Sequence, residues 1–196
     1  MGQEFELKYH CDETTQARIF EDFPVSWESI SMETTYYDTP NADLSAQKWT
    51  LRRRFENNIS ICTLKTPSPD GSRGEWETPC PDIRQALALL CALGAPEQLL
   101  EYRELIPVCA AKFTRRAAQI TLPEGKVELA LDAGRLIGGQ AESPLWELEV
   151  ELKEGSRQAA TDFADQLAQT YHLLPEEKSK YRRALELAKG EKSHGI

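Results

Sequence analysis

Apolar and polar residues alternate along most of the first two-thirds of the chain, beginning with EFELKYH at residues 4–10. A period of two sends successive side chains to opposite faces of an extended strand. One face of this strand carries Phe5, Leu7 and Tyr9, and the other carries Glu4, Glu6 and Lys8. The pattern predicts an apolar face that packs on a core and an opposite face that holds both signs of charge.

Similar strand patterns recur downstream. They cover residues 30–38, 49–56, 59–66, 74–79, 109–122, 126–132 and 145–153. Asn57-Asn58 is typical of a tight hairpin turn, and Pro123-Glu124-Gly125 marks another short connection. Short connections favour antiparallel pairing, because parallel neighbours need long crossover segments.

Helical patterns occupy residues 13–22, 82–93, 156–171 and 175–190. Asp82 is the predicted N-cap of the second helix and Gly94 its stop. Pro175 suits the first position of the last helix. The tail at residues 191–196 is expected to fray.

About eight antiparallel strands form a sheet large enough to curl, and closing such a sheet removes its exposed edges. We therefore predict a mainly β (α+β) fold: an eight-stranded antiparallel closed β-barrel with several flanking helices. An open antiparallel sheet is the alternative. The length of 196 residues suits one domain, which we place at residues 1–190.

Composition narrows the range of partners. A net charge of −9 argues against general binding to nucleic acid or to an acidic membrane, although a small anion can still bind a locally basic pocket. Five scattered cysteines form no CxxC pair, which indicates reduced thiols in a cytoplasmic protein. No apolar run approaches the length of a membrane span. We expect a small-molecule partner, with no nucleic acid, no membrane and no obligatory protein partner.

Charged residues repeat on the polar faces of these strands. The basic ones are Lys8, Arg52, Arg54, Lys65 and Arg115, and the acidic ones are Glu4, Glu6, Glu75, Glu77, Glu128, Asp132, Glu147, Glu149 and Glu151. Any one of these faces is readily explained as the solvated side of a sheet. Together they are harder to explain in that way, because like charges on neighbouring positions destabilise a sheet. Carboxylates suit hard divalent cations and arginines suit phosphate, so both sets indicate a polyanion bound with metal ions.

These motifs also follow the order found in one known family. The first strand resembles the E-x-E-x-K signature of the CYTH, or triphosphate tunnel metalloenzyme, superfamily. TTYYDTP (34–40), LRRR (51–54), TLK (63–65), RGEWE (73–77), VELALD (127–132), ELEVEL (147–152) and KSKY (178–181) follow in family order. The resemblance spans about residues 2–185 and is greatest to bacterial inorganic triphosphatases. Some of these carry an appended helical CHAD domain, which the present chain is too short to contain.

The resemblance implies an eight-stranded barrel whose interior binds a triphosphate with Mg²⁺ or Mn²⁺. It assigns phosphate binding to Lys8, Arg52, Arg54, Lys65, Arg115 and Lys180. It assigns metal binding to Glu4, Glu6, Glu75, Glu77, Glu128, Asp132, Glu149 and Glu151. Within these sets, Glu149 and Glu151 would hold the metal on the triphosphate, and Glu4 and Glu6 the metal near the attacking water. Lys8 and Lys180 complete the predicted catalytic group.

Some positions depart from a simple alternation. Lys112 and Arg116 are out of phase with Arg115, so the pattern leaves open whether either joins it inside. Arg53 is expected to face outward, and Glu147 is omitted because it lies near the predicted start of its strand.

The predicted function is metal-dependent hydrolysis of a linear triphosphate, and inorganic tripolyphosphate is the first choice of substrate. The alternatives are a thiamine or nucleoside triphosphatase, a class IV adenylyl cyclase and a non-catalytic binding module for polyphosphate or nucleotides. Such a module has little reason to line its site with carboxylates.

Overall fold

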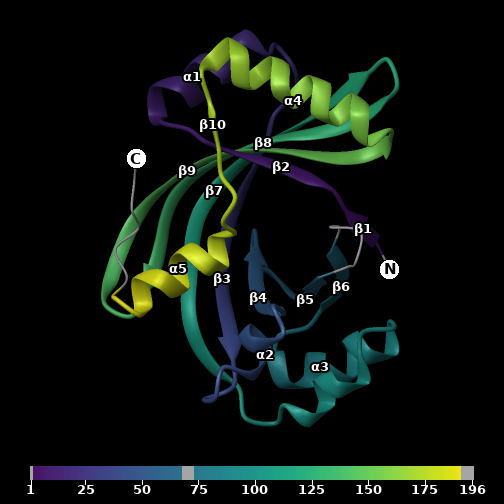
Figure 1. Ribbon diagram of the computed structural model, residues 1–196, viewed down its shortest axis with the longest axis vertical. Helices are drawn as coiled ribbons and strands as arrows, with labels where there is room; N and C mark the ends of the chain where they lie inside the picture. The colour runs from purple at the N-terminus through teal and green to yellow at the C-terminus, as the bar shows by residue number, and fades with distance from the viewer. Residues whose placement is uncertain (1, 68–72, 191–196) are drawn as a thin grey trace.

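The structure, a computed structural model, describes residues 2–67 and 73–190 (Figure 1). Its strands are β1 (Gly2–Glu4), β2 (Glu6–His10), β3 (Glu28–Asp38), β4 (Thr50–Glu56), β5 (Ile59–Pro67), β6 (Arg73–Pro79), β7 (Ile106–Leu122), β8 (Gly125–Gly138), β9 (Ala141–Gly155) and β10 (Leu174–Pro175). Its helices are α1 (Glu13–Asp22), α2 (Asp43–Ala46), α3 (Ile83–Ala92), α4 (Arg157–Tyr171) and α5 (Lys180–Ala188), with a 3₁₀ turn, η1 (Glu97–Glu101).

All the strands belong to one antiparallel sheet in the order β1-β6-β5-β4-β3-β7-β8-β9-β2-β10. β1 and β2 are consecutive pieces of the N-terminal stretch, separated only by Phe5. β1 pairs with β6 and β2 pairs with β9, so this stretch contacts both sides of the curled sheet. The mainly β, antiparallel, barrel-like fold is thereby confirmed. The expected continuous closure is corrected, because the hydrogen-bonded order is linear.

The strands differ in number and length from the prediction. The expected first strand is split in two, and the short β10 adds a tenth to the sheet. β8 continues to Gly138, six residues beyond its predicted end at residue 132. Glycine usually weakens a strand, but a side chain at Gly134 would place its Cβ 2.2 Å from the carbonyl oxygen of Lys112. Gly134 therefore permits the close approach of β7 and β8 that the longer strands require.

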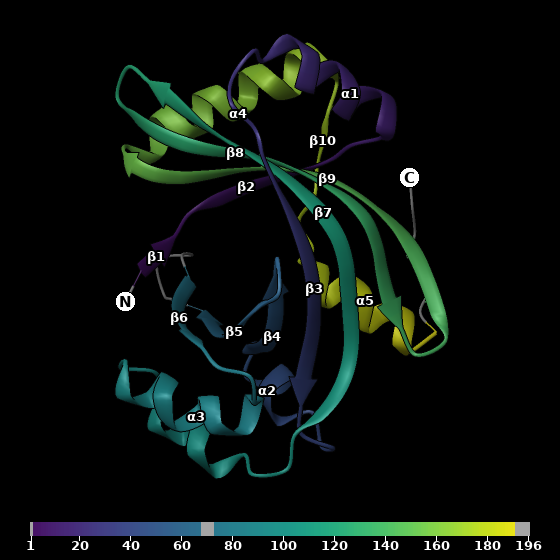
Figure 2. The same cartoon turned by 180° about the vertical axis from the view of Figure 1, so that it is seen from behind.

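Helices cover both ends of the outer face of the sheet (Figure 2). α1 and α4 pack on the apolar sides of β2, β8 and β9, where Tyr9, Ile19, Leu129, Val150 and Leu167 belong to one buried cluster. α3 and η1 cover β4, β5 and β6 through a second cluster. The predicted helices at residues 13–22, 82–93 and 156–171 are confirmed, and the Asp82 side chain accepts hydrogen bonds from the first-turn amides of α3. Among the described residues, no helix has both the length and the apolarity that a membrane span needs.

The last helix is shorter than predicted. Residues 174–175 form β10 against β2, and the helix begins only at Lys180, with Ser179 as its N-cap. The Pro175 signal was misleading because that residue extends the sheet edge, where a missing amide donor costs nothing. α5 packs on the inner face of the sheet, where Tyr181 and Ala184 join Tyr36 and Phe113 in a third cluster. The tail at 191–196 lies outside the described residues.

Candidate active site

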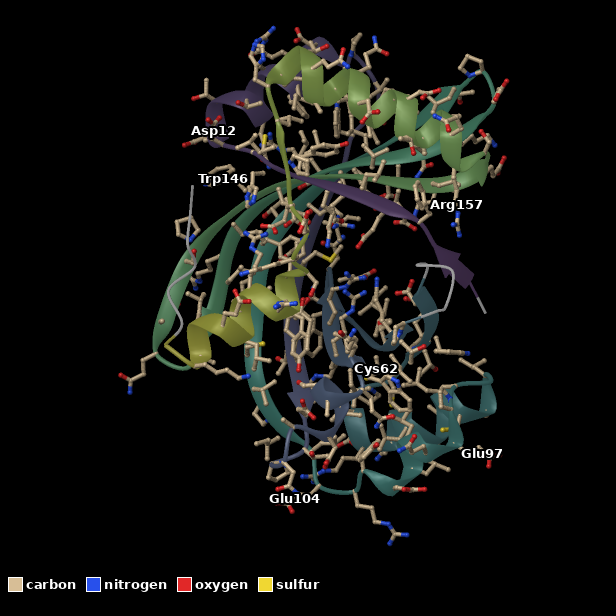
Figure 3. All side chains as sticks on the ribbon, in the orientation of Figure 1. Asp12, Cys62, Glu97, Glu104, Trp146 and Arg157 are labelled. Atoms are coloured by element: carbon tan, nitrogen blue, oxygen red, sulfur yellow. The ribbon has the colours of Figure 1, made fainter. Side chains whose placement is uncertain are left out.

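A cavity of about 450 Å³ lies on the inner face of the curved sheet. β2, β3, β4, β5, β6, β7, β8 and β9 all contribute to its wall, and the first residues of α5 border it. Figure 3 shows nitrogen- and oxygen-bearing side chains gathered in this interior, between α5 and the strands facing it. The cavity is therefore walled mainly by the polar faces that the alternation of the sequence defines.

Most of the predicted site residues meet here. The cavity is lined by Glu6, Lys8, Arg52, Arg54, Lys65, Glu75, Glu77, Arg115, Glu128, Glu149, Glu151 and Lys180. Asp132 is fully buried behind the lining and contacts Arg115. The side chain of Glu4 lies outside the described part of the structure. The sequence therefore predicted the position of these residues, while their chemical roles stay predictions.

The first strand shows how the alternation produces the site. Glu6 and Lys8 line the cavity, with their charged groups 3.7 Å apart. On the other face Tyr9 is buried in the core beneath α4, and Phe5 and Leu7 pack partly buried against the same core. The core fixes the register of the strand, because a slip of one residue would exchange the two faces.

Arg52 and Arg54 place two guanidinium groups side by side on β4. Arg52 lies 3.8 Å from Glu75, and Arg54 forms an ion pair with Glu56. The buried Nε atoms of Arg52 and Arg54, like that of the outward-facing Arg53 between them, have no hydrogen-bond partner among the described residues. Burial, and secondly the charge of Arg52, lower the pKa of Arg54. What sets Arg52 and Arg54 apart is that their guanidinium groups line the cavity, where two neighbouring positive charges suit an anion that accepts their hydrogen bonds.

Three carboxylates oppose one another on adjacent strands. Glu151 of β9 pairs directly with Glu128 of β8 on one side and with Glu6 of β2 on the other. Lys153 approaches Glu151 at 2.8 Å and Glu128 at 3.8 Å, which offsets part of their charge. The described residues that line the cavity include neither cysteine nor histidine. Carboxylate oxygens alone are the donor set that suits a hard divalent cation, so these residues fit Mg²⁺ or Mn²⁺.

A tighter acidic cluster lies behind this row. Ligand oxygens of Asp132, Glu147 and Glu149 lie within 4.8 Å of one another. Lys180 Nζ donates hydrogen bonds to Glu149 at 2.7 Å and to Glu147, and it forms an ion pair with Asp132 at 2.9 Å. This buried network holds Lys180 at the edge of the cavity.

Two arginines complete the buried network. Arg115 donates two hydrogen bonds to Asp132, of 2.8 and 2.7 Å, and another to Glu149. Arg183 pairs with Glu147 and lies 3.2 Å from Glu176. Because the cluster already has these cationic partners, we interpret Asp132 and Glu147 as positioning groups, whereas Glu149 also lines the cavity and stays a candidate metal ligand.

The network also fixes charge states. Burial alone would lower the pKa of Lys180, but Asp132, Glu149 and Glu147 outweigh it and hold that pKa well above its usual value. Burial likewise opposes ionisation of Glu149, yet Lys180 and Arg115 hold its pKa well below the usual range. For Glu147 burial dominates over Lys180 and raises its pKa to about 7. These carboxylates therefore favour the charged form of Lys180, which suits the binding of phosphate.

The sequence analysis missed some members of the site. Glu147 was omitted as a residue at the start of its strand, but β9 begins at Ala141 and continues the alternation through Glu147 to Glu149 and Glu151. Lys153 reaches the cavity despite the irregular register between β8 and β9 near residue 127. Arg183 lies one turn after Lys180, and no strand pattern pointed to it.

The basic positions left open on β7 are also resolved. Lys112 forms an ion pair with Glu33 at 3.0 Å, and Arg116 stacks on the ring of Phe20. Neither residue lines the cavity with Arg115. Arg53 donates a hydrogen bond to the carbonyl of Pro81, which confirms its outward direction.

The fold and the cavity together define a class of protein, in which a barrel-like antiparallel sheet encloses a charged interior that suits a polyanion with divalent cations. The chain belongs to the CYTH domain family, whose model matches residues 2–185.

An inorganic triphosphatase from Haemophilus influenzae is 32% identical over 144 residues. That match covers 71% of this chain and 41% of the relative, so the chain spans well under half of that protein.

Solved structures show the same fold. A candidate adenylate cyclase from Bacillus halodurans superposes with a TM-score of 0.63 at 22% identity, covering 93% of this chain and 98% of the other. HpAC1 from Hippeastrum, a candidate adenylyl cyclase with a dominant triphosphatase activity, gives a TM-score of 0.62 at 16% identity and covers 98% of both chains.

Proposed function

We propose that this domain hydrolyses a linear triphosphate with the help of Mg²⁺ or Mn²⁺, and that its preferred substrate is inorganic tripolyphosphate. The observation that carries the proposal is the division of one cavity into two kinds of wall. The guanidinium groups of Arg52 and Arg54 form one wall, and a row of opposed carboxylates forms the other. A triphosphate with bound divalent metal complements both walls at once, whereas a free anion complements only the first.

The relatives support a triphosphatase reaction in general. The Haemophilus influenzae protein is an inorganic triphosphatase, and HpAC1 shows a dominant triphosphatase activity. We therefore favour hydrolysis of a triphosphate over cyclisation of ATP as the reaction of this domain. The free thiols of all five cysteines further support work in a reducing compartment such as the cytoplasm.

Each wall has a separate task in this proposal. Arg52, Arg54 and Arg115 bind and orient the phosphoryl oxygens, and Lys180 adds a fixed positive charge where negative charge develops. Glu6, Glu128, Glu149 and Glu151 would hold the metal ions, with Glu75 and Glu77 on the facing strand. Bound metal would polarise the phosphoryl group and lower the pKa of a coordinated water. The carboxylates of the cavity would accept a proton from the attacking water.

The decisive experiment measures phosphate release from tripolyphosphate, ATP and thiamine triphosphate, with Mg²⁺ and Mn²⁺ supplied separately. We expect tripolyphosphate to give the highest kcat/KM. Structural similarity to a candidate adenylate cyclase makes cyclisation of ATP the second candidate, and this reaction releases pyrophosphate instead of phosphate. Cyclic AMP as the main product would replace the triphosphatase proposal, and binding without turnover would indicate a non-catalytic module.

Activity is expected to disappear in EDTA and to return with added Mg²⁺ or Mn²⁺. Carboxylate ligands without cysteine or histidine bind such ions exchangeably, so a chelator removes them without unfolding the protein. Phosphate release measured before and after metal addition, with circular dichroism as the folding control, checks this expectation. Full turnover in EDTA would refute the metal requirement.

Arg52→Ala and Arg54→Ala are expected to weaken tripolyphosphate binding while the melting temperature stays the same or rises. The two guanidinium groups repel each other without ligand, and each contact with phosphate contributes about 1.5–3 kcal/mol. Calorimetric titration and thermal melts test both parts. Arg53→Ala is the matched control, because the side chain between them faces outward. Equal affinity in all three variants would mean that β4 does not contact the substrate.

A further inference from the structure

A chain of hydrogen bonds outside the cavity ties the start of α5 to α2 and to the end of β3. It runs from Tyr181 of α5 through Ser45 of α2 to Asp38 at the end of β3. We propose that Ser45 and Asp38 are positioning residues that act through Tyr181 to place Lys180 in the cavity. The inference rests on the proposed function for its catalytic consequence, and its structural part can be tested separately.

Asp38 forms the fixed end of this chain. Its carboxylate is buried and accepts the backbone amides of Thr39 at 2.8 Å, Leu44 at 2.9 Å and Ser45 at 3.1 Å. These bonds hold the turn after β3 and the start of α2 against the strand end. With so many donors already committed to it, Asp38 has little freedom to move, and it can fix whatever binds to Ser45.

The direction of the hydrogen bonds follows from proton counting. An ionised carboxylate can only accept, so the Ser45 hydroxyl donates to Asp38 across 2.5 Å. Having used its single proton, Ser45 Oγ accepts the proton of the Tyr181 hydroxyl across 2.7 Å. Tyr181 keeps that proton, because burial foremost raises its pKa to about 12. The Tyr181 hydroxyl also lies 3.4 Å from the Asp38 carboxylate, a longer second contact that Ser45→Ala would leave in place, so the short bond to Ser45 is the part of the chain that this substitution removes.

This chain holds the residue next to Lys180. Tyr181 is the second residue of α5, its ring packs on Tyr36 with centroids 5.1 Å apart, and it is largely buried. Arg183 also anchors this turn through its ion pairs with Glu147 and Glu176. The later turns of α5 pack through apolar contacts, and Gly138 has no side chain where the backbone of Ala184 passes close to it. Apolar packing permits small sliding and rotation, whereas a directional hydrogen bond in the first turn does not. The Tyr181 hydroxyl, together with these ion pairs, thereby sets where the Lys180 side chain begins.

A substitution at Ser45 tests the positioning role without removing a group that contacts the substrate. Tyr181 borders the cavity, so its replacement would combine two effects. Ser45 and Asp38 are not among the residues that line the cavity, so a kinetic effect of Ser45 must pass through another group.

The test is Ser45→Ala, measured by kcat and KM for tripolyphosphate. We expect kcat/KM to fall about 10- to 100-fold, as small displacements of catalytic groups do, and Ser45→Thr to restore most of it. The control is Ser60→Ala, which removes a serine hydroxyl that donates to the carbonyl of Cys80 at 2.7 Å. Ser60 lies in β5, which is separated in the sheet from the strands β7, β8 and β9 that α5 contacts. This control is expected to keep wild-type kinetics.

The same substitution in a background without Lys180 distinguishes positioning from general destabilisation. Lys180→Met/Glu147→Gln removes one positive and one negative charge together, so the network stays balanced. If Ser45 acts through Lys180, Ser45→Ala lowers kcat/KM no further in that background. An equal fall in both backgrounds would assign Ser45 a merely structural role and overturn the proposal.

Hydrogen exchange gives a readout that does not depend on activity. The amides of Arg182 and Arg183 bond to the Ser179 side chain and backbone, at 3.2 and 3.0 Å. We expect Ser45→Ala to speed their exchange about 10-fold, because the first turn of α5 opens more easily. Unchanged exchange would overturn the proposal. If the wild-type protein neither binds nor hydrolyses a triphosphate, the proposed function fails, while exchange still decides whether Ser45 anchors α5.

Discussion

Glu6→Gln is expected to lower turnover of tripolyphosphate by about 100-fold or more while the protein stays folded and still binds its substrate. Glutamine has the size of glutamate and lacks the charge that a divalent cation needs. Glu6 lines the cavity and pairs directly with Glu151, which in turn pairs with Glu128. Removing one of three opposed carboxylates relieves repulsion, so tripolyphosphate binding is expected to hold or tighten.

Glu33→Gln is the matched control for this experiment. Glu33 is an exposed glutamate on the outer face of β3, paired with Lys112, so the same chemical change occurs away from the cavity. Steady-state kinetics, calorimetric binding and thermal melts on both variants separate chemistry from folding. Normal turnover in Glu6→Gln would mean that this carboxylate does not serve the reaction. A loss in Glu33→Gln equal to that in Glu6→Gln would mean that the two faces of the sheet have been misassigned.

Much of this site is visible in the sequence because strand alternation is a local property. Glu6, Arg52 and Glu151 were placed on the same side of their strands from the pattern alone, and each lines the cavity. The opposite faces fix the direction of the strands, because Leu7, Leu51 and Leu152 pack in or against the apolar clusters beneath the outer helices. Where one face must be buried, the direction of the other face follows.

The unpredicted features depend on contacts between distant segments. Glu147 is fully buried yet ionisable, and its burial is tolerable only because Lys180 and Arg183 arrive from a helix that follows more than thirty residues later. Neither the position of that helix on the inner face nor its start at Lys180 can be deduced from local patterns. Gly134 illustrates the same limit, because its local signal argues against a strand that its tertiary contact requires.

The largest effect on stability is expected for Lys180→Met. This substitution leaves Asp132, Glu147 and Glu149 buried together, with only Arg115 and Arg183 to offset them. Breaking a buried ion pair by removing one partner typically costs about 3–5 kcal/mol. Denaturant unfolding at pH 8 should reveal this loss, and turnover should fall as well because the phosphate loses a fixed positive charge. Lys153→Met, which removes a more exposed lysine, is the control and is expected to change stability little.

The dependence on pH identifies the cause of the loss. Without Lys180, the buried carboxylates ionise less readily in the folded protein, so their folded pKa values rise above the unfolded ones. Stability from such groups is fully present below the unfolded pKa, about 4, and is lost as the pH rises through the folded value. The deficit of Lys180→Met relative to wild type should therefore shrink from pH 8 to pH 5, and Glu147→Gln added to it should restore stability at pH 8. A deficit that is constant with pH would show that lost packing, not unpaired charge, destabilises the variant.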